Sequence, residues 1–88
     1  MKIKEGFVLR QVMGNNVIIA VGEASRNFHG MVQLNDSAAE IWKHIEKGCS
    51  REQIVNNMLD TYEAERELIE LDVDKVVKML AENGLIEL

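Results

Sequence analysis

Residues 34–59 read LNDSAAEIWKHIEKGCSREQIVNNML, and this stretch predicts two helices joined by one tight turn. Asn35, Asp36 and Ser37 have side chains that can accept from the free N–H groups at the start of the first helix. Apolar side chains at positions 38, 41, 42 and 45 have the i, i+3, i+4, i+7 spacing that lines one face of a helix. Gly48 ends this helix, because glycine adopts the left-handed conformation without a Cβ clash. Ser50 then begins a second helix as its N-cap, and Gln53 completes a capping box.

The residues before this stretch predict a small sheet. Residues 7–13 and 17–21 are rich in strand formers, and Gly14-Asn15-Asn16 between them has the chemistry of a hairpin turn. Residues 22–29 form a polar connection, and residues 30–34 form a short third strand that runs into the first helix. Three consecutive strands followed by helices favour an antiparallel sheet with the helices packed on it.

A third helix follows the helical pair. Its apolar stripe comprises positions 69, 73, 76, 77 and 80, its start lies between residues 63 and 69, and Asn83-Gly84 is a stop signal. The apolar tail, residues 85–88, is expected to pack back on the helices. The sequence therefore predicts one α+β domain over residues 1–88, with a sheet in 1–34, a three-helix unit in 35–84 and a tail in 85–88.

Composition sets outer limits on the class of protein. The 88 residues of the chain are enough to form one hydrophobic core. The single cysteine excludes an internal disulfide. No apolar run approaches the ~18–20 residues that a membrane span needs. Residues 1–11 lack the apolar core of a signal peptide, so we expect a cytoplasmic protein.

The charge distribution argues against nucleic acid as a partner. Residues 1–35 carry four basic and two acidic side chains, whereas residues 36–88 carry six basic and thirteen acidic ones, a net charge of −7. A helix-turn-helix DNA reader would present the third helix, and residues 63–82 hold seven acids against three bases. Such a helix repels phosphates, so a DNA-binding winged helix is the weaker reading.

No constellation of side chains indicates catalysis, a cofactor or a metal. The two histidines, His29 and His44, have no second ligand at metal-binding spacing. The serines at 37 and 50 are explained by helix capping, and the acids fall on helical faces without an apolar pair. We therefore expect a protein that is not an enzyme and that acts by binding.

A sheet edge is the better candidate for a site. If residues 30–34 are an outer strand, their unpaired backbone groups are a template for an extended peptide. The third helix can form the opposite wall, where Asp72, Lys75 and Met79 flank the core stripe at i, i+3 and i+7. If the N–H of Val32 points outward, its replacement by proline is expected to abolish such pairing. An exposed edge of this kind also allows a homodimer.

The stretch LNDSAAEIWKHIEKGCSREQIV together with DVDKVVKMLAENGLI resembles the PqqD-like family of pyrroloquinoline quinone biosynthesis. The matching elements cover roughly residues 30–88 and include Leu34-Asn35, Ile41-Trp42, Asp72-Val73 and Gly84-Leu85-Ile86. The resemblance implies a winged-helix-like RiPP recognition element, a three-stranded sheet followed by three helices. RiPPs are ribosomally made peptides that are modified after translation.

The resemblance also implies a function. Such modules hold the leader segment of a precursor peptide as a strand added beside the third strand and present it to a modifying enzyme, commonly a radical SAM maturase. Position 76, often aromatic in the family, is valine here, which implies a shallower groove or a smaller pocket. The alternative is a protein–protein adaptor of the same fold with another partner. Carried over, the groove comprises Met31, Val32, Gln33 and Leu34 on one side and Asp72, Lys75, Val76 and Met79 on the other.

Overall fold

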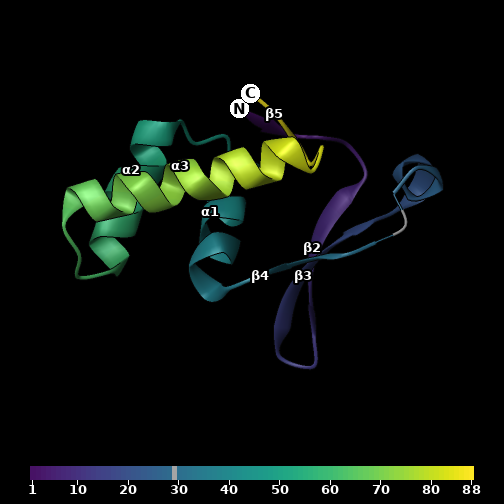
Figure 1. Cartoon of the computed structure of the whole chain (residues 1–88), viewed down its shortest axis with the longest axis horizontal. Coiled ribbons are helices and arrows are strands. Elements are labelled where there is room, and N and C mark those ends of the chain that lie inside the picture. Colours follow the sequence, from purple (N-terminus) through teal and green to yellow (C-terminus); the bar gives the residue numbers. More distant parts are fainter. Residues whose placement is uncertain (29) are drawn as a thin grey trace.

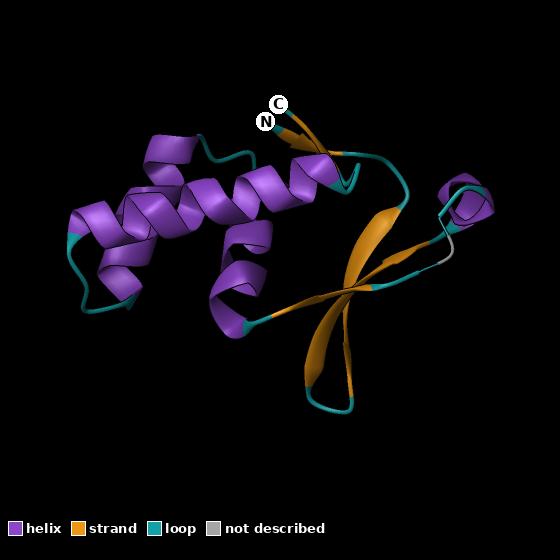
Figure 2. Ribbon diagram, in the orientation of Figure 1, coloured by secondary structure: helices purple, strands orange, loops and turns teal. Residues whose placement is uncertain are grey.

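A three-stranded antiparallel sheet followed by three helices organises the chain (Figures 1 and 2). The computed structural model describes residues 1–28 and 30–88; His29, which the sequence assigns to the polar connection, lies outside them. The sheet has the order β2-β3-β4, with β2 at Phe7–Val12, β3 at Asn15–Ala20 and β4 at Val32–Leu34. The helices are α1 (Asp36–Glu46), α2 (Arg51–Thr61) and α3 (Arg66–Glu82). The predicted α+β fold class is confirmed.

The hairpin turn lies earlier than the sequence predicted. Met13 and Gly14 form a two-residue loop and both have positive φ, 52° and 82°. Turns with two such residues match the right-handed twist of the flanking strands. Asn15 and Asn16, expected in the turn, therefore begin β3. Asn16 is the buried polar residue of this region, and its side chain donates a 2.9 Å hydrogen bond to Asp36 at the start of α1.

The predicted helix ends are confirmed, but the capping role expected of Ser37 is wrong: Ser37 lies inside α1 and donates a 3.1 Å hydrogen bond to the Asn35 side chain. The side chain of Asn35 caps α1 by accepting a 2.9 Å bond from the Ala38 N–H. Both reciprocal bonds of the Ser50–Gln53 capping box are present at the start of α2. Gly48 has φ +83°, and its N–H and the next one bond carbonyls of the last turn of α1, as in a Schellman motif.

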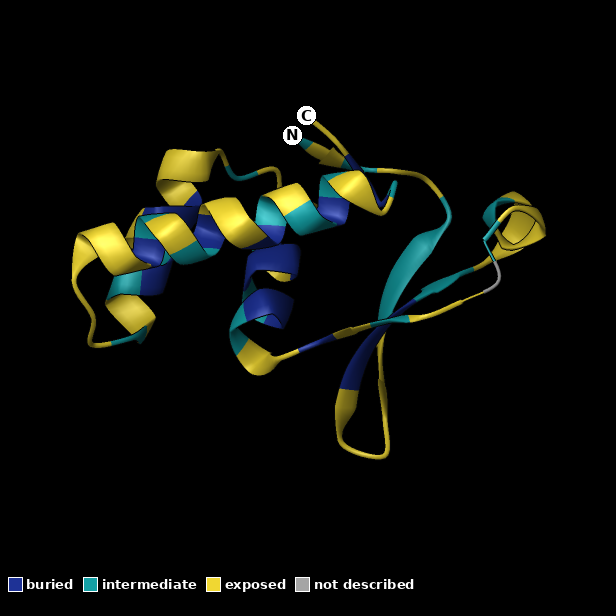
Figure 3. Cartoon of the chain, in the orientation of Figure 1, coloured by how far each residue is buried: buried dark blue, intermediate teal, exposed yellow. Residues whose placement is uncertain are grey.

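The core lies between the three helices and is completed by side chains from β3, the end of β4 and the tail (Figure 3). Apolar side chains from every helix and from β3 are fully buried, and Trp42 is the largest of them. The apolar stripes expected in the first and third helices supply half of the buried residues of this cluster. Burial of an aliphatic or aromatic side chain contributes about 1.5–3 kcal/mol, so this cluster dominates the stability of the fold.

Two further elements lie outside the main sheet. A 3-10 helix, η1 (Gly22–Arg26), occupies the polar connection. The tail packs back as predicted, as β5 (Ile86–Glu87), with Leu85 and Ile86 buried. Its partner is β1 (Lys2–Ile3), an antiparallel pairing that the sequence did not indicate. Among the described residues, no helix is long and apolar enough to cross a membrane.

Candidate functional site

A groove of about 320 Å³ separates β4 and the first turn of α1 from α3. Leu34 and Val76 form its apolar floor and are almost completely buried, while Asp72 and Lys75 stand at its rim. Met79 closes one end and is half-buried. The lining residues are Gln33, Leu34, Asn35, Ala38, Asp72, Lys75, Val76 and Met79.

The backbone of β4 presents one residue to the open edge, and the register shows which one. Val21 N–H donates a 2.7 Å bond to the Gly6 carbonyl, so residues 6 and 21 are a hydrogen-bonded pair of the hairpin. Hydrogen-bonded pairs alternate along antiparallel strands. Residues 15, 17 and 19 of β3 therefore bond β2, and residues 16 and 18 bond β4.

The alternation continues across the next ladder. Leu34 lies opposite Asn16 and Val32 opposite Ile18, so the N–H and C=O groups of both point into the sheet. Gln33 lies opposite Val17, and its N–H and C=O point outward toward the unpaired edge. The condition attached to Val32 in the sequence prediction is therefore not met, because Gln33 carries the outward donor.

The structure brings together six of the eight predicted site residues. Gln33, Leu34 and the four residues predicted on α3 all line the groove. Met31 precedes β4 with 64% of its surface exposed, and Val32 is half-buried; neither lines the groove. Sequence reasoning missed Asn35 and Ala38, which it had assigned to the cap and core stripe of α1. Their position directly after the edge strand was the available signal.

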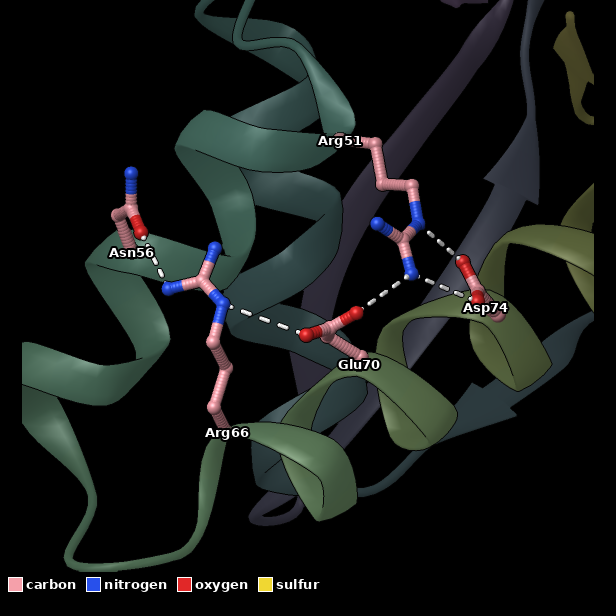
Figure 4. A network of polar contacts seen from close by, with 5 residues as sticks. All are labelled: Arg51, Asn56, Arg66, Glu70 and Asp74. Carbon is pink, nitrogen blue, oxygen red and sulfur yellow. Dashed lines mark hydrogen bonds and ion pairs between the residues drawn. The ribbon is translucent and has the colours of Figure 1, made fainter.

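Ion pairs between α2 and α3 fix the orientation of α3, the outer wall of the groove (Figure 4). The Arg51 guanidinium donates to both carboxylate oxygens of Asp74, at 2.6 and 2.9 Å, and to Glu70 at 3.4 Å. Arg66 contacts the other oxygen of Glu70 at 3.2 Å and donates to Asn56 at 3.0 Å. The hydrogen bonds from Arg51 lower the pKa of Asp74, and those to Asp74 raise the pKa of Arg51.

The inner wall is fixed by hydrogen bonds from the hairpin. Gln11 of β2 donates to the Asn16 side chain at 3.3 Å, and Asn16 donates in turn to Asp36. This chain of bonds ties the first turn of α1, and with it the end of β4, to the centre of the sheet. Because the bridging amide is buried, loss of one partner leaves an unsatisfied polar group. Both walls are thus held in place before anything binds between them.

The groove offers backbone hydrogen bonding, an apolar floor and a charged rim. The described residues contain no group of three or more His, Cys, Asp or Glu side chains that could hold a metal ion. An unpaired strand edge beside an apolar groove is the arrangement that binds an extended peptide by strand addition. Fold and site together define a small α+β domain of the winged-helix-like kind with an open strand edge facing its last helix.

Comparison with known proteins gives this class a family. The family model described as Coenzyme PQQ synthesis protein D (PqqD) matches residues 16–86, so the chain belongs to the PqqD family. The predicted resemblance is confirmed and extends further into the sheet than the motifs indicated. No curated protein matches the chain.

Two solved structures share the fold over nearly the whole chain. A lasso peptide synthetase B1 complexed with its leader peptide is 27% identical and has a TM-score of 0.79, covering 96% of this chain and 93% of its own. TbiB1 in complex with the TbiA(beta) leader peptide is 24% identical with a TM-score of 0.81, covering 99% and 95%. At 24% sequence identity, the likeness to TbiB1 shows only that the two chains share a fold.

Proposed function

We propose that this protein captures the leader segment of a ribosomally made precursor peptide in the groove between β4 and α3. The observation that carries the proposal is the outward N–H and C=O of Gln33 at the lip of an apolar groove. Membership of the PqqD family and likeness to a lasso peptide synthetase B1 solved with a leader peptide support it. The bound segment becomes a fourth strand beside β4.

Because the β4 edge is short, backbone hydrogen bonds can supply only a small part of the affinity for the leader. A net contribution of about 1 kcal/mol per hydrogen bond gives the two bonds of Gln33 roughly 2 kcal/mol. Micromolar binding needs about 8 kcal/mol. Most of the affinity therefore comes from apolar side chains of the leader on the floor formed by Leu34, Ala38 and Val76. The ladder fixes register and direction, and the floor selects sequence.

The proposed role is not catalytic. The protein holds the leader while a separate modifying enzyme acts on the rest of the precursor, and we propose a radical SAM maturase, in the cytoplasm, as that enzyme. Holding substrate and enzyme together raises the effective concentration of the core peptide without contributing to the chemistry. No cofactor is needed in the groove for this role.

An NMR titration tests the proposal. Labelled protein is titrated with synthetic leader peptides of the precursor genes that lie beside its own gene. We expect shifts concentrated in residues 31–38 and 72–79 that saturate at micromolar peptide. If no neighbouring leader causes shifts at concentrations a hundredfold higher, leader capture is refuted and a protein–protein adaptor with another partner takes its place.

A further inference from the structure

The outer wall of the groove is much longer than the edge that it faces. β4 has three residues and spans ~10 Å, whereas the 17 residues of α3 span ~25 Å. In Figure 1 the N-terminal half of α3, drawn in green, extends well beyond the point where β4 ends. A peptide that continues past Gln33 in that direction has no strand to pair with and only α3 to contact.

That half of α3 exposes two large apolar side chains. Leu68 and Leu71 are 61% and 67% exposed, although the same helix buries its other aliphatic stripe completely or nearly so. They line a second hollow of about 540 Å³ whose lining includes Asp72 and Lys75, both also at the rim of the β4–α3 groove. Leu68, Asp72, Lys75 and Met79 have the i, i+4, i+7, i+11 spacing of one helical face, so the two hollows are continuous along α3.

The charges around this second hollow leave a small positive excess once the ion pairs are counted. Asp74 is already neutralised by Arg51, with the 2.6 Å contact described above. Lys75 and Lys78 have no carboxylate within ion-pair distance among residues 1–28 and 30–88. Asp72, the other carboxylate of the lining, also has no ion pair among the described residues, so two ammonium groups and one carboxylate stand beside the two exposed leucines. They lie within residues 36–88, whose net charge is −7. An acidic group brought between Lys75 and Lys78 gains attraction to both ammonium groups.

We propose that the hollow lined by Leu68, Leu71, Lys75 and Lys78 is a second subsite for the same leader peptide, specific for a segment that combines an aliphatic and an acidic side chain. This inference rests on the proposed function. The β4 edge supplies one hydrogen-bonded pair of residues, and the second subsite supplies the apolar contact that the short strand lacks. A leader therefore carries two separate recognition segments, one extended on β4 and one beyond it.

Binding of synthetic neighbouring leaders, followed by fluorescence anisotropy, tests the subsite. The variants are Leu68→Ser, Leu71→Ser and the double variant; Leu88→Ser, at a residue 83% exposed outside both hollows of α3, is the matched control. We expect at least a roughly tenfold loss of affinity for the double variant and none for the control. Replacing the aliphatic residue of the leader by serine should cause the same loss in the wild type and no further loss in the double variant.

The charged part of the subsite is tested separately. Lys78→Glu should weaken binding at low salt, and a leader whose acidic residue is replaced by lysine should restore it. Equal leader affinity in the wild type and the double leucine variant overturns the subsite while leaving capture at β4 intact. The subsite is also overturned if these variants slow the modifying enzyme while leader affinity is unchanged, because the hollow then contacts the enzyme and not the leader. Absence of binding by the wild type refutes the proposed function itself.

Discussion

Because the backbone N–H of Gln33 points outward, strand addition can be tested by removing that one donor. Gln33→Pro removes the one N–H that β4 presents to a bound peptide, while proline is tolerated on an edge strand whose N–H faces solvent. The variant loses one ladder bond, about 1 kcal/mol, and leaves a carbonyl of the peptide without its donor. The combined cost of about 1–3 kcal/mol corresponds to a leader complex that is roughly 5- to 150-fold weaker.

Two companion variants separate the backbone from other effects. Gln33→Ala keeps the N–H and removes a side chain whose amide donates to Asn15 at 3.3 Å, so it should weaken the leader complex less than Gln33→Pro does. Val32→Pro removes the N–H that points at β3, so it should lower the free energy of unfolding by about 1–3 kcal/mol. The two proline variants, one residue apart, thus report on different ladders.

Calorimetric titration gives the affinities, and thermal unfolding followed by circular dichroism shows that each variant is folded. A folded Gln33→Pro protein that binds the leader as tightly as Gln33→Ala refutes docking at this edge. If Val32→Pro weakens the complex at unchanged stability and Gln33→Pro does not, the alternation derived from the Gly6–Val21 bond is wrong.

Two predictions concern stability. A Cβ on Gly6, which has φ +93°, meets the Ala24 Cβ at 2.6 Å, so Gly6→Ala should cost about 1–3 kcal/mol in chemical denaturation. Gly14→Ala, with φ +82° and open space around it, is the control and should cost less. Hydrogen bonding by Arg51 lowers the pKa of Asp74 in the folded protein. The contribution of this ion pair to folding stability is therefore fully present above the pKa that Asp74 has in the unfolded chain, and it is lost as pH falls through the folded-state pKa of Asp74. The stability gap between wild type and Asp74→Asn should therefore narrow below pH ~4; a gap that widens there contradicts the assignment.

Helix boundaries were predictable because their signals are local. Asn35, Gly48 and the Ser50–Gln53 box each act within one turn of the residue itself, and each performs the predicted role. The groove wall on α3 followed from the same logic, since residues flanking a buried stripe at helical spacing must border solvent. The opposite wall, β4, was predictable because the strand lies directly before α1 in the sequence.

The remaining features depend on register, which no local pattern carries. Asn15 and Asn16 have turn chemistry, yet the Met13–Gly14 loop fits the strand twist and shifts them into β3. That shift of the turn sets which residues of β3 bond β4, and so makes Gln33, not Val32, the outward residue. The pairing of β1 with β5 was also hidden, because each has only two residues and their partnership spans the whole chain.

The β1–β5 pairing has a consequence for how such a domain can be joined to other proteins. Lys2 lies opposite Glu87, so the two chain ends emerge side by side, as Figure 1 shows. Neither end contributes to the lining of the groove. An enzyme fused before residue 1 or after residue 88 through an equally short linker would therefore start from the same point relative to the bound leader. The order of the two partners in a fusion should matter little, whereas linker length should decide how far along the precursor the enzyme can act.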